Sequence, residues 1–147
     1  MEDMEARVVL DTDVVIDYLK RAPDPTVSKL FDRIREGRLR AYTTSVTAFE
    51  LYRGARRAPD PHKRMLEIRS ILTFVVCLNY DEAAANAASD ISVTLEQEGI
   101  PIEIRDIFIG AIARTSGFPL VTKNVEHFRR IPDLRVIKPS DLLRQIK

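Results

Sequence analysis

Short apolar runs rich in β-branched residues alternate along the chain with longer segments of helical periodicity. The apolar runs predict strands over residues 8–10, 40–44, 73–78, 120–122 and 135–137. The helical spacing predicts helices over residues 14–19, 25–35 and 46–57, then one ending at Leu72, one from Asp81 to about Gly99, one over 104–116 and one from Pro139. Strands that alternate with helices are typical of a parallel sheet covered on both faces. The pattern therefore predicts an α/β fold, a three-layer α/β/α arrangement with a central, mostly parallel sheet of about five short strands.

Start and stop signals support several of these boundaries. Ser45 is expected to cap the helix over residues 46–57, and Gly117 is expected to close the helix over residues 104–116. Neither repeats nor low-complexity tracts divide the sequence. With 147 residues, 45% of them hydrophobic, the chain is predicted to form one domain, residues 1–147, with its own core.

Charge and cysteine usage place the protein in a broad class. The formal net charge is only +1, so the charge of the whole chain does not indicate a nucleic-acid partner. Any basic surface must be local. The single cysteine, Cys77, cannot form an internal disulfide and lies in an apolar run, which predicts a buried thiol in the reducing cytoplasm.

The first residues of the chain and the length of its apolar runs argue against export or membrane insertion. The first residues include Glu2, Asp3 and Glu5, whereas a signal peptide begins with basic residues. No apolar run approaches the roughly 20 residues that span a bilayer. We therefore expect a cytoplasmic protein without a membrane partner.

Three acidic residues occupy positions where chemistry is expected. Asp11 directly follows the strand over residues 8–10, and ligands of open parallel sheets bind beyond the carboxyl ends of the strands. The ordinary alternative for Asp11 is a helix cap, but Thr12 and Asp13 are equally suited to that task.

Two further acids stand on helix faces that carry apolar or small residues. Glu50 shares one side of its helix with Val46, Phe49 and Gly54, where a carboxylate is costly unless a cation pairs with it. An ion pair between Glu50 and Arg53 is the alternative. Asp106 heads a similar face with Ile109 and Gly110, and the alternative for it is a favourable helix-start charge.

If these acids meet, they need a cation between them. Hard divalent ions such as Mg²⁺ prefer carboxylate oxygens. Zinc is poorly supported, because the chain offers only His62 and His127 and no cysteine pair. Phosphate-binding and dinucleotide-binding glycine motifs are absent from the sequence, as is the serine elbow.

Four segments together resemble one known family. They are VLDT (residues 9–12), TSVTAFELYRGA (44–55), DIFIGAIA (106–113) and LVTKN (120–124), the last followed by Phe128, Ile131 and Pro132. In this order they are similar to the PIN-domain ribonucleases, and most of all to the VapC-type toxins of prokaryotic type II toxin–antitoxin pairs. The resemblance covers nearly the whole chain.

The resemblance implies a PIN-like fold and a metal-dependent endoribonuclease. It implies Mg²⁺, with Mn²⁺ as a substitute, and it implies that Asp11 and Asp106 hold the metal with Glu50 as the third acid. It also implies a homodimer that acts on RNA and is inhibited by a cognate VapB-type antitoxin, often through an arginine or a tail that reaches the acidic site.

The last of the four segments departs from the family pattern. Many members carry a fourth acid where this chain has Asn124, whose amide can ligate a metal but brings no charge. A second metal ion is therefore in doubt. Glu103 or Glu126 is a substitute for the missing acid, although an exposed surface acid is the plainer interpretation of each. Thr122 is a candidate hydroxyl near the metal or the substrate phosphate.

Local basic segments are the expected RNA contacts, since RNA binding requires cations near the phosphates. They contain Arg53, Arg56, Arg57, Lys63, Arg64, Lys123, Arg129 and Arg130, of which none is singled out.

Two alternatives remain at this stage. One is a phosphatase of the haloacid dehalogenase type, in which Asp11 would be the nucleophile and Lys123 the conserved lysine. Asp11 and Asp13 resemble that family's paired aspartates, but Asp133 and Asp141 are too widely separated for its late acidic pair. The other is a catalytically weak interaction module, for which Asn124 is the best support.

Overall fold

A computed structural model describes residues 6–146 of the chain, so the acidic residues Glu2, Asp3 and Glu5 lie outside the described part. Five parallel strands form one sheet in the order β3-β2-β1-β4-β5. They are β1 (Ala6–Leu10), β2 (Leu39–Thr44), β3 (Val76–Leu78), β4 (Leu120–Val121) and β5 (Val136–Ile137). The predicted α/β class, with a parallel sheet of five short strands, is confirmed.

Helices connect the strands and lie close to the predicted positions. They are α1 (Thr12–Tyr18), α2 (Pro25–Arg35), α3 (Ser45–Arg56), α4 (Pro61–Leu72), α5 (Glu82–Gln97), α6 (Ile104–Ser116), α7 (Val125–Phe128) and α8 (Pro139–Gln145). The sequence pattern missed α7, because a single turn is too short to show a period. Thr44, and not Ser45, caps α3: its hydroxyl accepts a hydrogen bond from the Thr47 amide at 3.0 Å.

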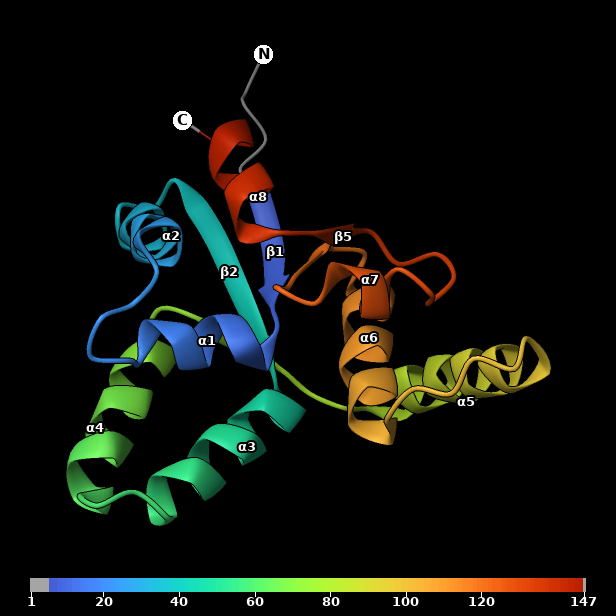
Figure 1. The fold of residues 1–147 in the computed structure, drawn as a ribbon, viewed down its shortest axis with the longest axis horizontal. Coiled ribbons are helices and arrows are strands. Elements are labelled where there is room, and N and C mark those ends of the chain that lie inside the picture. The colour runs from blue at the N-terminus through green and yellow to red at the C-terminus, as the bar shows by residue number, and fades with distance from the viewer. Residues whose placement is uncertain (1–5, 147) are drawn as a thin grey trace.

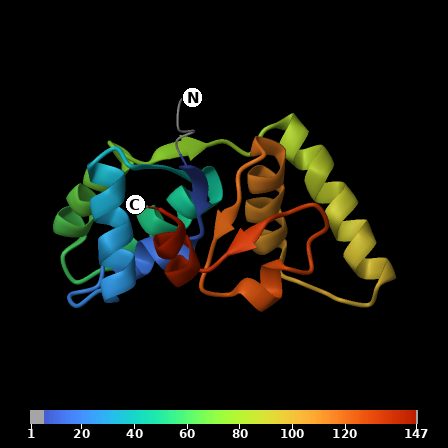
Figure 2. The same cartoon turned by 90° about the horizontal axis from the view of Figure 1, so that it is seen from above.

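The strand β1 divides the interior into two cores. Its side chains alternate, so Val8 and Leu10 pack on one face while Val9 packs on the other. The first core is completed by apolar residues of α1, α2, α3, α4 and α8, and the second by residues of α5, α6 and α7. Figures 1 and 2 show these two groups of helices on opposite sides of the sheet. Both faces of the sheet are therefore covered, as the pattern predicted.

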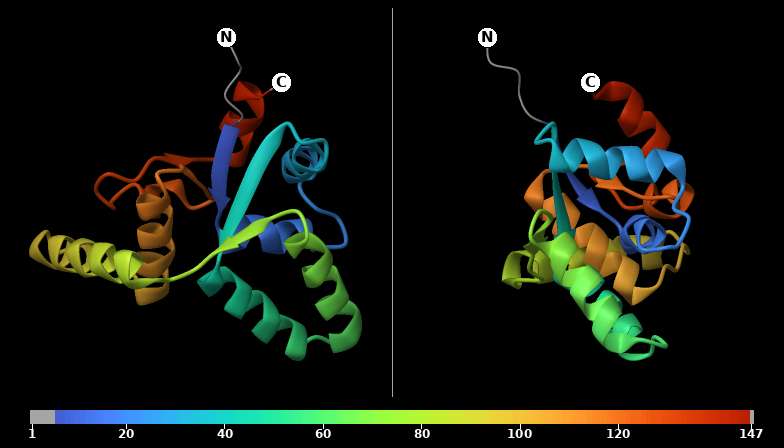
Figure 3. Two further views of the ribbon diagram at one scale, coloured as in Figure 1. Left: turned by 180° about the vertical axis from the view of Figure 1, so that it is seen from behind. Right: turned by 90° about the vertical axis from the view of Figure 1, so that its left-hand side faces the viewer.

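The edge strand β3 differs from the prediction. Cys77 is exposed rather than buried, and its neighbour Val76 is 55% exposed. The strand pairs only with β2, and the view from behind in Figure 3 shows it at the rim of the sheet. An apolar run alone does not distinguish a central strand from an edge strand, and this is why the buried thiol was wrongly predicted.

The carboxyl edge of the sheet carries the candidate residues. Leu10 pairs with Val121 and Thr44 pairs with Leu78, so β1, β2, β3 and β4 end at the same edge. The helices α1 and α3 begin there, directly after their strands. Beyond this edge α3 and α4 pack together as a helical pair (Figure 1). Within residues 6–146, none of the helices is long and apolar enough to cross a membrane.

Candidate active site

Asp11 stands at the junction of β1 and α1 and is 3% exposed. Its Oδ1 accepts a hydrogen bond from the Thr12 amide at 2.8 Å. Asp11 therefore caps α1, which was the alternative to a functional role in the sequence analysis. Its Oδ2 accepts a second bond at 2.7 Å from the Thr122 hydroxyl, which follows β4. The cap orients one oxygen along the helix and leaves the carboxylate facing the neighbouring strand end. Capping and a functional role are compatible here.

Asp13 joins Asp11 at this strand end. The Thr122 hydroxyl lies 3.3 Å from Oδ2 of Asp13, and the Lys123 amide donates to the same oxygen at 3.1 Å. The other oxygen, Oδ1, is buried and accepts no hydrogen bond from a described residue. A buried carboxylate oxygen without a donor is rare, because losing its water is costly. Sequence reasoning treated Asp13 as a helix-start acid and, in the phosphatase alternative, as one of two paired aspartates, whereas the structure places it in the acidic cluster.

The electrostatics of these two aspartates follow from burial and proximity. Burial raises the pKa of Asp11 to about 7, and the neighbouring Asp13 carboxylate raises it as well. Burial also raises the pKa of Asp13, against the lowering effect of the Lys123 amide. Two carboxylates in such contact either share a proton or bind a cation. This half of the cluster is therefore short of positive charge.

Glu50 lies on α3 and is held by a relay of threonine hydroxyls. The Thr12 hydroxyl donates to Oε1 of Glu50 at 2.7 Å and lies 2.8 Å from the Thr47 hydroxyl. The Thr44 hydroxyl donates in turn to Thr47 at 3.1 Å. Each hydroxyl has one proton, so the order of donation is Thr44 to Thr47, Thr47 to Thr12, and Thr12 to Glu50. The relay fixes Glu50 over the ends of β1 and β2.

Arg105, at the start of α6, joins Glu50 to Asp106. Its Nε donates to Oε2 of Glu50 at 2.6 Å, and its Nη2 donates to Oε1 at 2.9 Å. Its Nη1 contacts Oδ1 of Asp106. The alternative of a Glu50 ion pair was therefore right in kind, but the partner is Arg105 and not Arg53. The arginine is also close enough to Asp11 to lower the pKa of that carboxyl group.

Asp106 is 5% exposed in the first turn of α6. Nε2 of His127 lies 2.8 Å from its Oδ2, on the side away from Arg105. Burial raises the pKa of Asp106, while Arg105 and His127 lower it. One turn further, a Cβ on Gly110 would lie 2.5 Å from Cδ1 of Ile131, so any larger residue there would displace the end of that buried side chain.

The cluster fits a hard divalent cation by its chemistry. Four carboxylates and several hydroxyls supply only oxygen ligands, and Oδ1 of Asp13 has no partner. The side-chain positions, however, do not form a metal site. In residues 6–146 no three His, Cys, Asp or Glu side chains are grouped closely enough to hold a metal ion. Both oxygens of Glu50 and both of Asp106 are engaged with Arg105 or His127.

The remaining predicted residues have mixed fates. Thr122 is fully buried and lies between Asp11 and Asp13. Asn124 is exposed, and its backbone amide donates to the Thr122 hydroxyl at 3.0 Å, so it supports the strand end through its main chain. Glu103 and Glu126 are both exposed, in line with their plainer interpretation.

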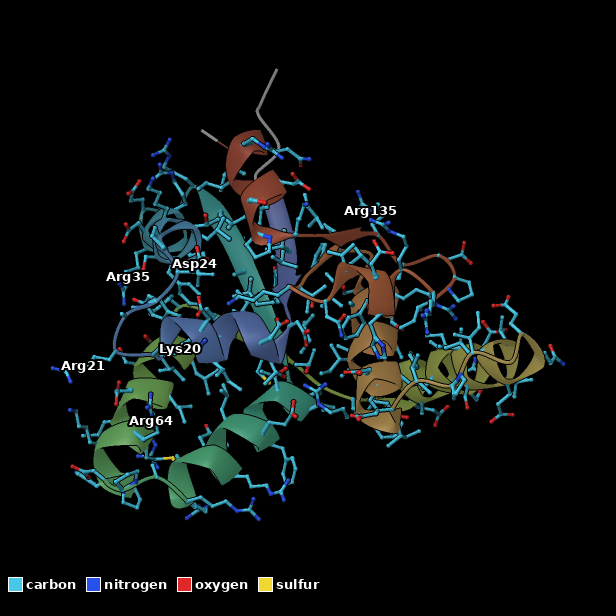
Figure 4. All side chains as sticks on the ribbon, viewed as in Figure 1. Lys20, Arg21, Asp24, Arg35, Arg64 and Arg135 are labelled. Atoms are coloured by element: carbon cyan, nitrogen blue, oxygen red, sulfur yellow. The ribbon has the colours of Figure 1, made fainter. Side chains whose placement is uncertain are left out.

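Several basic residues that were candidates for RNA contacts are engaged elsewhere. Nη1 of Arg64 donates to the Leu19 carbonyl at 2.9 Å, and the side-chain view in Figure 4 shows this arginine on α4 beside the end of α1. Nζ of Lys123 lies 3.2 Å from Oδ1 of Asp17. A haloacid dehalogenase-type phosphatase would need a lysine at the nucleophile, so the Lys123–Asp17 pair speaks against that alternative.

Two hollows adjoin Glu50. One of about 460 Å³ lies between α3 and the start of α6, and its wall includes Phe49, Arg53, Ile104 and Arg105. The other, of about 270 Å³, lies between the end of α1 and the α3–α4 pair. A larger hollow of about 590 Å³ near α7 and α8 is lined by Glu126 but by none of Asp11, Glu50 and Asp106. The candidate site is thus open to a ligand from the α3 side.

Comparison with known proteins decides the family. The model of the PIN domain matches residues 8–134. The chain belongs to the PIN-domain family. Ribonuclease VapC2 of Haemophilus influenzae is 31% identical over 129 residues, which cover 88% of this chain and 95% of the relative. The tRNA(fMet)-specific endonuclease VapC of Shigella flexneri is also 31% identical, with the same coverage of both chains. The resemblance of this PIN-domain protein to VapC-type ribonucleases is confirmed.

Solved structures agree with the fold. A chain of the DNA-bound VapBC complex from Salmonella typhimurium matches with a TM-score of 0.82 and 27% identity, covering 91% of this chain and 98% of that one. A chain of the VapBC2 complex from Rickettsia felis matches with a TM-score of 0.80 at 20% identity, which supports the PIN fold alone.

Sequence reasoning missed three residues of the site: Asp13, Arg105 and His127. Asp13 lies two positions after Asp11, so its proximity was available as a signal but was attributed to the helix start. Arg105 immediately precedes Asp106, yet its principal partner is 55 positions away. His127 reaches Asp106 from α7, the helix that the pattern did not predict.

Proposed function

We propose that this PIN-domain protein is a metal-dependent endoribonuclease, the toxin of a type II toxin–antitoxin pair, with Asp11, Asp106 and Glu50 as its catalytic and metal-binding residues. The observation that carries the proposal is the set of contacts through Thr12 and Arg105 that links these acids at the carboxyl edge of the sheet, in a chain similar to VapC ribonucleases along nearly its whole length. Thr122 and Asn124 belong to the same edge, as support for Asp11.

The residues of the chain have separate tasks in this reaction, the hydrolysis of an RNA phosphodiester to a 5′-phosphate and a 3′-hydroxyl. Mg²⁺, or Mn²⁺ in its place, supplies an acidified water and stabilises negative charge on the phosphate when it is bound. Asp11 offers a carboxylate that Thr12 and Thr122 hold in one orientation. Asp106 offers a second from the first turn of α6, and Glu50 completes the set from α3.

Preorganisation is the main contribution of the protein. The threonine relay and the Thr122 hydroxyl fix the acids from behind, so little side-chain freedom remains to be lost when a cation and a phosphate bind. Asn124 brings no charge, and it therefore supports one tightly held metal ion rather than two.

The partners follow from the relatives and from the surface. Both solved structures named above are VapBC complexes, so we propose a VapB-type antitoxin as the inhibitor of this chain. We also propose that residues 1–147 act as a single PIN domain in the cytoplasm, with RNA as substrate and without a membrane partner.

A homodimer is proposed for the face beside the larger of the two Glu50 hollows. Phe49 and Ile104 are 61% and 59% exposed there, which is unusual for large apolar side chains and favours cover by a second copy. Sedimentation of the wild-type protein is expected to give a dimer, and Phe49→Asp is expected to give a monomer. A wild-type monomer at micromolar concentration would contradict this assembly.

The experiment that tests the function compares two substrates. Purified protein with Mg²⁺ is expected to cleave a structured RNA internally and to leave p-nitrophenyl phosphate intact. Asp32→Asn, on the exposed surface of α2, serves as a control that keeps wild-type cleavage. Phosphomonoester hydrolysis without RNA cleavage would favour the phosphatase, and the absence of both activities together with the absence of metal binding would favour the interaction module.

A further inference from the structure

Arg105 is one of the three site residues that sequence reasoning missed. All three of its guanidinium nitrogens contact carboxylates. Nε and Nη2 contact the carboxylate of Glu50, and Nη1 contacts that of Asp106. Bidentate pairs of this kind are the strongest ion pairs that arginine makes, because the planar fork matches the two carboxylate oxygens. The guanidinium of arginine is not deprotonated in proteins, so this positive charge is permanent. A fixed cation therefore already lies between two of the three proposed metal ligands.

This cation uses the oxygens that a metal ion would need. Both oxygens of Glu50 accept from Arg105, while Asp106 gives one oxygen to Arg105 and the other to His127. A divalent ion and a guanidinium on the same carboxylates repel each other, so the binding of one weakens the binding of the other. Glu50 is therefore expected to join a metal site more readily once Arg105 has left it.

The surroundings leave room for that movement. The Arg105 side chain is 35% exposed and lines the hollow of about 460 Å³ between α3 and α6. Its backbone lies in the first turn of α6, next to the 59% exposed Ile104, so only side-chain torsions need to change. By contrast, the donors to Asp11 are a backbone amide and a fully buried hydroxyl, which have no such freedom.

We propose that Arg105 is a displaceable internal counter-cation, which holds Glu50 and Asp106 in a closed arrangement without metal and competes with the divalent ion for them. The inference rests on the proposed function, because it takes these acids as the metal site. It adds that the affinity for metal is set by the release of an arginine of the same chain.

The test measures metal affinity rather than cleavage. Calorimetric titration of metal-free protein with Mn²⁺ is expected to show at least tenfold tighter binding for Arg105→Gln than for wild type. Arg53→Gln is the matched control, since Arg53 lines the same hollow one turn from Glu50 without pairing with it in the observed contacts. Its affinity is expected to stay within about twofold of wild type.

A second variant separates the fork from the charge. Arg105→Lys keeps the positive charge but loses bidentate pairing, and its affinity is expected to fall between those of wild type and Arg105→Gln. An affinity equal to wild type would mean that charge alone matters, and the displacement of a bidentate fork would be rejected. Equal affinity changes in Arg105→Gln and Arg53→Gln would reject it too.

Thermal unfolding supplies a readout that a purely structural role would not give. Without metal, Arg105→Gln is expected to melt several degrees below wild type, because Glu50 and Asp106 lose their counter-charge. With saturating Mn²⁺ the two melting temperatures are expected to converge, since the metal replaces the arginine in both. A deficit that persists at saturating Mn²⁺ would overturn the proposal.

These outcomes distinguish a failure of this inference from a failure of the proposed function. If wild type fails to cleave RNA but the Mn²⁺ affinities follow the expected order, the ribonuclease proposal fails and the role of Arg105 stands. If wild type cleaves RNA with metal and Arg105→Gln binds Mn²⁺ no more tightly, the role of Arg105 fails and the ribonuclease proposal stands.

Discussion

The two halves of the acidic cluster satisfy their negative charge in different ways. At the ends of β1 and β4, Asp11 and Asp13 are held by a threonine hydroxyl and backbone amides, which are neutral donors. Between α3 and α6, Glu50 and Asp106 are held by the guanidinium of Arg105 and, for Asp106, by His127. One half is short of positive charge and the other already contains a cation.

This difference indicates which half of the acidic cluster gains more from binding a metal ion. Burial and Asp13 raise the pKa of Asp11 to about 7, and Oδ1 of Asp13 lacks a donor. Such a pair gains from any cation that reaches it. The α3–α6 half gains less, because binding there must first break existing ion pairs. The strand-end half is thus expected to be the primary attachment for the metal.

The largest expected effect comes from the strand-end half and from Asp106. Asp11→Asn and Asp106→Asn keep the shape of each side chain and remove its charge, so we expect RNA cleavage to fall by about a thousandfold or more. The measurement is kcat/KM on a fluorogenic RNA with saturating Mg²⁺. Wild-type activity in either variant would remove that residue from the catalytic set.

Glu50→Gln is expected to cost less, because Arg105 already neutralises Glu50 in the metal-free protein. We expect a loss of about 10- to 100-fold in kcat/KM, with the fold confirmed by circular dichroism. A loss as large as that of Asp11→Asn would contradict the idea that pairing with Arg105 lessens the contribution of Glu50.

Thr122→Val tests the neutral donors of the strand-end half. The change removes the hydroxyl that donates to Asp11 and leaves the Asn124 amide without its acceptor, so we expect about a tenfold weaker Mn²⁺ affinity. Thr122→Ser keeps the hydroxyl and is expected to restore most of the affinity. Equal affinities in the two variants would mean that the hydroxyl has no part in holding Asp11.

The smallest expected effect concerns the threonine relay under Glu50. Thr47→Val breaks the relay between Thr44 and Thr12, both of which are buried, and we expect a loss of about 1 kcal/mol in the free energy of unfolding. Urea denaturation measures this loss, and cleavage is expected to change by only a few-fold. Full stability with a large loss of cleavage would give the relay a catalytic rather than a structural role.

Much of the fold was predictable because its signals are local. The unbroken apolar run of β1 reflects burial on both faces of the sheet, and the helical spacing of α2 reflects burial on one side of that helix, so sequence patterns record both directly. The exposure of Cys77 was not predictable, since it depends on β3 being an edge strand. The helix α7 was missed because four residues carry no period.

The site was predictable to a different extent. Asp11, Glu50 and Asp106 follow from carboxylates placed at element starts and on packed faces, together with the family resemblance, and their roles stay a prediction. The contacts of Arg105 were not predictable, because a flexible side chain on α6 reaches a carboxylate on α3 only after both helices have packed on the sheet. Long side chains between distant elements leave no periodic trace in a sequence.

We propose that RNA cleavage by this protein depends on a divalent ion held at Asp11 and its neighbouring acids. The most direct measurement is RNA cleavage by the purified protein in EDTA, followed by titration with Mg²⁺, with Asp11→Asn run in parallel. We expect no RNA cleavage in EDTA. Adding Mg²⁺ is expected to restore cleavage by the wild type and not by Asp11→Asn. Undiminished cleavage in EDTA, or equal recovery of the variant, would contradict this proposal.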